Sequence, residues 1–293
     1  MKTVREVKQQ SSLPLHESTI LLTFLLKKSR EFLLTHPETL VSSQLRQKFT
    51  RLEKKRSQNW PLAYLTKTQA FYGLNFRVNP SVLIPRPETE MIVEVVNKLL
   101  AQKLVTRSNK NLTLVDIGTG SGAIVIAIIK EFAKQYPEAK KRFNAWAIDI
   151  SPSALKVARA NAKTHQLTNQ IKFKLGNLLN PLPPLVNQDL IITANLPYLT
   201  KKQIQNSPSI THEPRLALDG GSQGLKYYRA LFKQIKAAQY HTFTLLCEID
   251  PQQKTACNQL ARRFFPNAKI IKYRDLKHHY RLLVISSLPS RLE

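Results

Sequence analysis

The pattern of apolar and polar positions changes near residue 112. From there on, short apolar runs alternate with amphipathic stretches, which predicts strands alternating with helices. The expected strands are Leu112–Ile117, Phe143–Asp149, Ile171–Leu175, Leu190–Ala194, Phe243–Ile249, Ala268–Tyr273 and Tyr280–Ser286. The expected helices are Ser121–Tyr136, Ser151–His165, Gly224–Gln239 and Pro251–Phe264. This alternation predicts an α/β fold with a doubly wound, mostly parallel sheet covered by helices on both faces.

The preceding residues follow other patterns. Residues 1–12 are polar and are expected to fray, whereas apolar residues at helical spacing predict two helices within 17–58, the second opened by Pro37. Residues 62–83 predict a β-hairpin around Gly73, and Met91–Leu100 a helix. We therefore expect three parts, namely a small helical domain over 1–60, a hairpin linker over 61–83 and a large domain over 84–293.

The charge of the chain is unusual, with 45 Lys and Arg against 19 Asp and Glu, a formal net charge of +26. Such a chain either contacts nucleic acid nonspecifically through a basic surface or carries an evenly basic surface without that role. No apolar run approaches the roughly 18 residues of a membrane span, and no secretory signal is evident. The two cysteines fit neither a zinc spacing nor a disulfide framework, so we expect no metal and a cytoplasmic protein.

A glycine-rich loop follows the first expected strand. It reads Asp116-Ile-Gly118-Thr119-Gly120-Ser121-Gly122 and opens the next helix. Glycines let a backbone turn sharply and approach a ligand, but this spacing alone fits both dinucleotides and S-adenosylmethionine. Asp149 ends the second strand, where a carboxylate can accept both hydroxyls of a ribose; its alternative role is helix capping beside Ser151. Together, loop and acid predict a ribose-bearing cofactor.

The segment Asn195-Leu196-Pro197-Tyr198 follows the apolar strand that ends at Ala194. The Asn195 side-chain oxygen and the Leu196 carbonyl can accept both N–H groups of a planar amine or amide, Pro197 holds Leu196 extended, and Tyr198 offers a flat face. Two such acceptors favour positive charge on the nitrogen as a methyl group arrives. A simple turn is the alternative interpretation of the segment.

These motifs in this order resemble the release-factor glutamine N5-methyltransferases of the HemK/PrmC type. Three further segments carry the resemblance: Pro61-Leu-Ala-Tyr64 with Phe71-Tyr-Gly-Leu-Asn-Phe76, Val82-Leu-Ile-Pro-Arg-Pro-Glu-Thr-Glu90, and Glu213-Pro-Arg-Leu-Ala-Leu-Asp-Gly-Gly221 with Gly224. The resemblance covers roughly residue 60 to the end. It implies a class I methyltransferase sheet of seven strands with an antiparallel last strand, and an N-terminal helical domain, which we expect to dock the substrate.

The resemblance also implies the chemistry. S-adenosylmethionine would be the methyl donor, leaving S-adenosylhomocysteine, and the acceptor would be the glutamine of the Gly-Gly-Gln motif in peptide-chain release factors. Carried over by motif, Gly118 to Gly122 would wrap the donor, Asp149 would hold its ribose, and Asn177 and Leu178 would lie beside the adenine. Asn195 to Tyr198 would hold the glutamine amide, with Asn195 also beside the donor.

The sequence departs from the family pattern at Leu196, where the family has a proline, as well as at Asn177 and Gln223 and in the segment Asp275–Arg281. Asn-Leu-Pro-Tyr is also the form of the motif in ribosomal RNA adenine dimethyltransferases. An RNA or DNA adenine N6-methyltransferase is therefore the alternative enzyme, and a non-catalytic RNA-binding protein that kept the fold is a third hypothesis. The Ile-Pro-Arg-Pro-Glu-Thr-Glu segment favours the glutamine methyltransferase.

Overall fold

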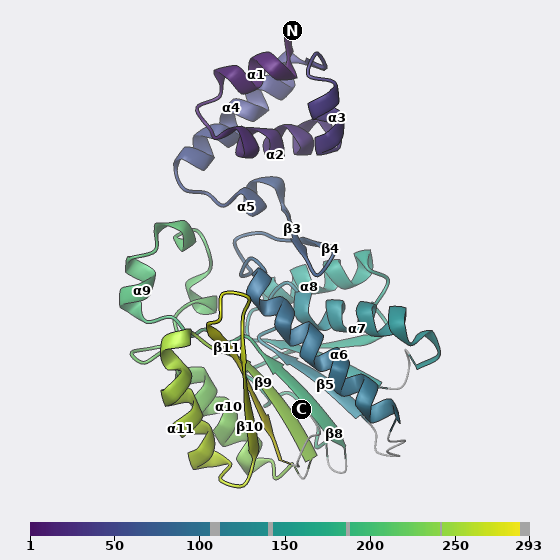
Figure 1. Ribbon diagram of the computed structural model, residues 1–293, viewed down its shortest axis with the longest axis vertical. Helices are drawn as coiled ribbons and strands as arrows, with labels where there is room; N and C mark the ends of the chain where they lie inside the picture. Colours follow the sequence, from purple (N-terminus) through teal and green to yellow (C-terminus); the bar gives the residue numbers. More distant parts are fainter. Residues whose placement is uncertain (106–111, 140–142, 186–187, 241, 288–293) are drawn as a thin grey trace. The chain divides into compact units, whose positions relative to one another are not determined.

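Seven strands of the chain form one sheet in the order β10-β11-β9-β8-β5-β6-β7 (Figure 1). Their bounds are β5 Leu112–Ile117, β6 Phe143–Asp149, β7 Ile171–Leu175, β8 Asp189–Ala194, β9 Thr242–Glu248, β10 Lys269–Arg274 and β11 Tyr280–Ser286. The computed structural model describes residues 1–105, 112–139, 143–185, 188–240 and 242–287. The described chain divides into two compact units, Met1–Thr68 with Ser207–His212, and Gln69–Asn206 with Glu213–Glu293.

The sheet has the topology expected from the sequence. β8, β5, β6, β7 and β9 pair in parallel, whereas β11 runs antiparallel to both β9 and β10. Each predicted strand is present within a residue or two of its expected bounds. The α/β class, the mostly parallel sheet and the antiparallel last strand are thus confirmed.

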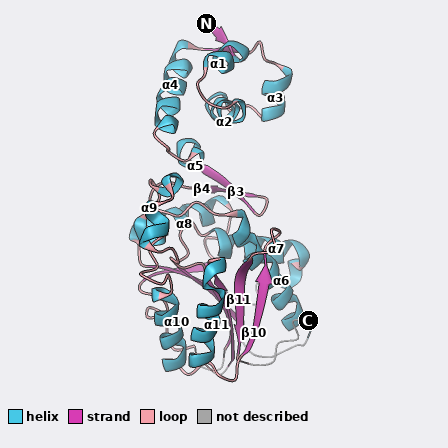
Figure 2. Ribbon diagram, turned by 60° about the vertical axis from the view of Figure 1, so that its left-hand side comes forward, coloured by secondary structure: helices cyan, strands magenta, loops and turns pink. Residues whose placement is uncertain are grey.

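Helices cover both faces of this sheet (Figures 1 and 2). Side chains of α6 (Glu90–Val105), α7 (Ala123–Gln135) and α8 (Pro152–Thr164) share one apolar core with one face, and those of α10 (Lys226–Ala237) and α11 (Lys254–Phe264) share a second core with the other. The strands alternate between the two cores: Leu114 belongs to the first and Val115 to the second. Successive side chains of a strand point to opposite faces of the sheet, and here both faces are buried. These strands are therefore almost wholly apolar.

The unit that contains the N-terminus is a small helical bundle with its own core, formed around Leu21, Leu22, Leu33 and Phe49. Its elements are β1 Lys2–Thr3, α1 Val4–Gln10, α2 Leu15–Leu26, α3 Arg30–Thr35, β2 Leu40–Val41, α4 Ser43–Ser57 and α5 Leu62–Thr66. The segment Ser207–His212, distant in sequence, joins this unit. There the His212 ring stacks on Trp60 with ring centroids 4.4 Å apart, and its Nε2 lies 2.9 Å from the Gln58 carbonyl oxygen.

Two expectations for the N-terminal part were wrong. The first residues do not fray, because Thr3 and Glu6 form a capping box that starts α1 and buries Val4. Pro37 opens no helix; the second long helix, α4, starts later, with Ser42 as its N-cap.

The predicted hairpin is shorter than expected, since Leu62–Thr66 is the helix α5. Its strands are β3 Thr68–Phe71 and β4 Leu74–Arg77, joined by Tyr72 and Gly73 with positive φ of 49° and 69°. A two-residue loop with positive φ is favoured in hairpins because its backbone twist matches the twist of the two flanking strands. The short helix α9, Lys201–Gln205, lies in the loop region after β8. Within the described ranges, no helix combines the length and apolar character needed to cross a bilayer.

Candidate active site

A cavity of about 360 Å³ lies at the carboxyl ends of β5, β6 and β8. This edge is where open α/β sheets bind ligands, and β5 is the strand on whose two sides the strand order reverses. The volume falls in the range of small-molecule sites. Among its lining residues are Gly118, Thr119, Gly120, Ser121, Asp149, Asn177, Leu178, Asn195, Leu196 and Pro197.

The glycine-rich loop between β5 and α7 bends where its glycines stand. Gly118, Gly120 and Gly122 have φ values of 68°, 55° and 81°, which disfavour other residues. The Gly118 and Thr119 N–H groups donate to the Ile148 carbonyl, each at 2.9 Å, and so bind the loop to the end of β6. A Cβ on Gly120 would meet only the Gly118 carbonyl oxygen, at 3.9 Å. The loop therefore leaves open space beside Gly120 for a ligand.

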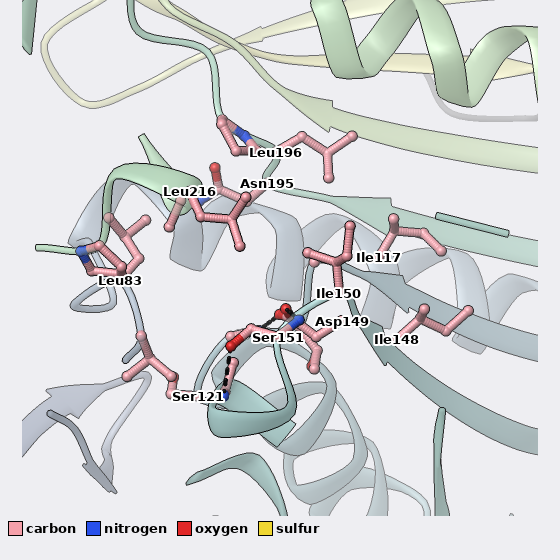
Figure 3. A pocket seen from close by; sticks show the side chains of 18 of the residues that line it. Leu83, Ile117, Ser121, Ile148, Asp149, Ile150, Ser151, Asn195, Leu196 and Leu216 are labelled. Atoms are coloured by element: carbon pink, nitrogen blue, oxygen red, sulfur yellow. Dashed lines mark hydrogen bonds between the residues drawn. The ribbon is translucent and has the colours of Figure 1, made fainter. Parts of the chain in front are cut away.

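Asp149 joins this loop to the start of α8 (Figure 3). Its Oδ2 accepts the Gly120 N–H at 2.8 Å and its Oδ1 accepts the Ser151 N–H at 2.9 Å. Burial raises the pKa of the Asp149 carboxyl, and the backbone donors of Ser151 and Gly120 oppose this. Both roles considered from the sequence are compatible, because each carboxylate oxygen keeps a lone pair beyond its one backbone bond.

A second carboxylate supports the loop from within the sheet. Asp116 is fully buried and accepts hydrogen bonds from the Thr119 hydroxyl at 2.6 Å and the Thr193 hydroxyl at 2.7 Å. Burial raises the pKa of Asp116 to about 6, more than the two hydroxyls lower it. Asp116 thus ties β5, the glycine-rich loop and β8 together without lining the cavity.

Asn195 and Leu196 lie across the cavity from Asp149 (Figure 3), and Pro197 lines the same cavity. The Asn195 Nδ2 donates to the Thr89 hydroxyl at 3.1 Å. Neither the Asn195 Oδ1 nor the Leu196 carbonyl accepts a hydrogen bond from any described residue. Leu196 itself is buried, and its Cδ2 would lie 3.1 Å from a Cβ placed on Gly118. The leucine side chain therefore supports the glycine-rich loop while its carbonyl stays available.

The Leu196 N–H, which a proline would lack, also has a partner. It donates to the Tyr228 hydroxyl at 3.4 Å, and that hydroxyl contacts the Ala194 carbonyl at 3.1 Å and the Glu248 carbonyl. Tyr228 is fully buried on α10. The replacement of proline by leucine in this turn therefore leaves no unsatisfied donor.

The segment around Gly220 supports the turn after β8 through backbone hydrogen bonds. The Leu199 N–H donates to the Leu218 carbonyl at 3.0 Å and the Gly220 N–H to the Leu199 carbonyl at 2.8 Å. The Gln253 Nε2 donates to the Tyr198 carbonyl at 2.6 Å. The Ala-Leu-Asp-Gly-Gly sequence is thus a backbone support for the turn.

A strap formed by residues 81–89 and 214–217 supplies the remaining cavity wall. Glu213, buried, holds the two parts of the strap together: it accepts the Ile84 N–H at 3.1 Å and pairs with Arg86. The Tyr72 N–H donates to Glu90 at 2.7 Å, which fixes the hairpin to the start of α6. These contacts give a structural reason for the Ile-Pro-Arg-Pro-Glu-Thr-Glu segment.

The structure brings together all predicted site residues except two. Gly122 does not line the cavity but begins α7, close to Ala158 and Ile126. The Tyr198 ring also lies outside the lining, with its hydroxyl donating to Glu248 at 3.2 Å. The cavity also has lining residues from the hairpin and strap that no sequence motif indicates, chiefly Phe71, Leu83, Arg86, Thr89 and Leu216. Only the family resemblance drew attention to the hairpin and strap segments, because residues that line a cavity share no recognisable sequence motif.

Comparison with known protein families and relatives gives consistent matches. Residues 3–66 match the PrmC N-terminal domain and residues 108–242 a methyltransferase domain. The chain is 33% identical over 270 residues to a release factor glutamine methyltransferase of Dictyoglomus turgidum, covering 92% of this chain and 90% of that protein. It is 36% identical over 239 residues to the protein of that name from Coxiella burnetii, covering 81% and 79%.

Solved structures share the fold at lower identity. The catalytic domain of hMettl16 in complex with an RNA hairpin has a TM-score of 0.56 at 13% identity, covering 92% of this chain and 91% of that one. The N-terminal domain of human METTL16 has a TM-score of 0.50 at 13% identity, covering 91% and 94%. At such identity the likeness shows the fold alone.

Proposed function

The chain belongs to the release factor glutamine methyltransferase family, and we propose that it methylates the glutamine of the Gly-Gly-Gln motif in peptide-chain release factors. The methyl donor would be S-adenosylmethionine and the acceptor atom the side-chain amide nitrogen, N5. The observation that carries the proposal is the pair of free acceptors, Asn195 Oδ1 and the Leu196 carbonyl, on the cavity wall across from Asp149. Such a pair fits an NH₂ group on an sp² carbon.

The residues of the cavity fit the donor. Asp149 can accept two ribose hydroxyls on the lone pairs that its backbone bonds leave free. The open space at Gly120 suits a chain that passes close to the backbone, and Leu178 and Ile150 offer apolar surface for an adenine. When bound, S-adenosylmethionine supplies an electrophilic methyl group on a positively charged sulfur.

The turn after β8 would act on the acceptor. An amide nitrogen is a weak nucleophile because its lone pair is delocalised. Asn195 Oδ1 and the Leu196 carbonyl would each accept one amide N–H, which orients the lone pair and favours positive charge on the nitrogen as the new N–C bond forms. The amide nitrogen held by these two acceptors would take the methyl group, the electron pair of the broken carbon–sulfur bond would stay on sulfur in S-adenosylhomocysteine, and the nitrogen would lose one proton to water.

The helical unit is the proposed docking surface for the release factor. Its helix α4 exposes Lys48, Arg51, Lys54 and Lys55, which would attract an acidic protein surface. The proposal includes the domain boundaries at residues 60 and 83. It also includes a nonspecific contact of the basic surface with nucleic acid. We place the reaction in the cytoplasm, together with protein synthesis.

The test is to incubate the purified enzyme with labelled S-adenosylmethionine and a release factor, then locate the label by mass spectrometry. A mass increase of one methyl group on the Gly-Gly-Gln glutamine is expected, and none on a release factor with alanine at that glutamine. Ribosomal RNA serves as the competing acceptor. Label on RNA adenine with an unlabelled release factor would establish the alternative enzyme instead, and donor binding without any transfer would favour the non-catalytic hypothesis.

A further inference from the structure

Glu248 is a buried carboxylate behind the Asn195 turn, at the end of β9. It is 3% exposed and does not line the cavity. Its Oε1 accepts the Tyr198 hydroxyl at 3.2 Å, whereas its Oε2 is buried without a close hydrogen-bond partner among the residues described. A buried carboxylate is costly unless its acceptors are used, so this one calls for a functional reason.

Thr89 connects this carboxylate to the acceptor site. The Thr89 hydroxyl accepts a hydrogen bond from the Asn195 Nδ2 at 3.1 Å, so its own hydrogen is available to another acceptor. Burial raises the pKa of the Glu248 carboxyl, and the Thr89 hydroxyl opposes this by stabilising the charged form. The Thr89 hydroxyl therefore contacts Asn195 directly and also influences the ionisation of Glu248.

The direction of the Thr89–Asn195 bond decides what the cavity offers. A hydroxyl and a primary amide can pair in two ways: the amide nitrogen donates to the hydroxyl oxygen, or the hydroxyl donates to the amide oxygen. An ionised carboxylate can only accept. Taking the Thr89 hydrogen would leave Thr89 to accept from Asn195 Nδ2, as it does in the structure, and would leave Asn195 Oδ1 free for the substrate. The reverse pairing would present Nδ2, a donor, to an amide NH₂.

We propose that Glu248 is a positioning residue that fixes, through the Thr89 hydroxyl, the Asn195 amide with its oxygen toward the acceptor. This inference deepens the proposed function and rests on it. Glu248 does not act as a base on the substrate, because it lies outside the cavity and its link to Asn195 runs through Thr89. The glutamate selects an orientation of the Asn195 amide and takes no proton.

The discriminating variant is Glu248→Gln, which keeps the shape of the side chain and adds a donor. The glutamine amide can donate to Thr89, so the Thr89 hydroxyl turns toward Asn195 Oδ1 and the amide reverses. We expect kcat for release factor methylation to fall on the order of a hundredfold, with donor affinity within twofold of the parent by calorimetry. Parent-like kcat in Glu248→Gln would overturn the proposal.

A double-mutant cycle with Thr89 separates orientation from a structural role. Thr89→Val removes the hydroxyl and lowers kcat by itself, whereas Thr89→Ser keeps the hydroxyl and should retain activity within about threefold of the parent. In the Thr89→Val background, Glu248→Gln should cost nothing further. An equal loss from Glu248→Gln in both backgrounds would mean that Glu248 acts by another route.

Asp189→Asn is the matched control. Asp189 is another buried acid of the same sheet, paired with Lys103 at the opposite end of β8. Parent-like kcat is expected for this variant, and a loss similar to that of Glu248→Gln would overturn the orientation argument. Circular dichroism and donor titration establish that each variant is folded. Parent enzyme that fails to label the release factor would refute the proposed function, whereas active parent with active Glu248→Gln would refute only this inference.

Discussion

Gly220 packs directly against the backbone of Tyr198. A Cβ on Gly220 would lie 2.7 Å from the Tyr198 Cα and 2.5 Å from the Pro197 carbonyl oxygen. Both distances are shorter than real side-chain contacts allow, and the obstructing atoms are backbone, which cannot rotate away. The glycine therefore determines how closely the segment after residue 216 can approach the turn that holds Asn195.

Gly220→Ala should displace that turn. We expect a loss of about 1–3 kcal/mol in unfolding free energy from overpacking and at least a tenfold lower kcat, because Asn195 and Leu196 move with the turn. Denaturant unfolding and steady-state kinetics measure the two effects. Gly73→Ala is the control, since it has a positive φ of 69° but no atom within 4 Å of the added Cβ. It should lower stability without lowering kcat; equal kinetic losses in both variants would contradict the argument.

The close approach at Gly220 also shows where sequence reasoning stops. The strands, the glycine-rich loop and Asp149 could be predicted because each depends on a local pattern: apolar runs, glycines after a strand, an acid at a strand end. The roles of Gly220 and Glu213 depend on partners distant in sequence. No periodicity identifies such partners, so only the resemblance singled out those segments.

The wrong expectations have a similar cause. Pro37 matched a helix-start pattern, but Ser42 provides the N-cap of α4. The sequence pattern predicts Leu62–Thr66 in the hairpin, yet these residues form α5, whose Leu65 packs into the core of the helical unit. Short segments take their structure from the core that they join, which a local pattern does not describe.

Asp149→Asn should weaken donor binding. The change removes the charge and one acceptor, which is worth about 1.5–3 kcal/mol, so the donor Kd should rise roughly tenfold to a hundredfold. Burial raises the pKa of the Asp149 carboxyl. As the pH falls, the parent should therefore begin to lose donor affinity at a higher pH than it would with an exposed aspartate. Calorimetry from pH 5 to 8 checks both effects. An unchanged donor Kd in a folded variant would mean that Asp149 only contacts the backbone of this protein and does not bind the donor.

Asn195→Ala should affect the reaction more than binding of the donor. Its Oδ1 is needed most when positive charge develops on the amide nitrogen, so kcat should fall roughly a hundredfold or more. The donor Kd should change by less than threefold. Single-turnover kinetics with saturating enzyme measures the chemical step directly. Near-normal turnover would show that the segment is merely a turn.

Asp116 should make stability depend on pH. Its folded pKa of about 6 lies above the ordinary 3.8, so between these values the folded state binds more protons than the unfolded state. The contribution of this group to stability therefore falls as pH rises from 4 to 6, by about 2–3 kcal/mol in total. In Asp116→Asn that dependence is absent. Denaturant unfolding at pH 4, 5, 6 and 7 should show the parent losing stability relative to Asp116→Asn as pH rises; a constant difference would contradict the shift.

The exposed basic face of α4 should govern the encounter with the release factor. Lys48 and Arg51 are one turn apart on this helix and both are exposed. Reversing both to glutamate changes the formal charge by four units, from +26 to +22. If the partner surface is acidic, KM for the release factor should rise several-fold through a slower association, with kcat and donor Kd unchanged.

The control reverses Lys233 and Lys236, which are exposed on α10 in the other unit and cause the same change in net charge. Docking on α4 predicts a KM effect in the first variant only, and this difference should shrink when salt rises from 50 to 500 mM, since screening weakens exposed charges. Equal increases in KM in both variants would mean that the net charge of the chain attracts the release factor. Only a local contact can distinguish two surfaces that lose the same number of charges.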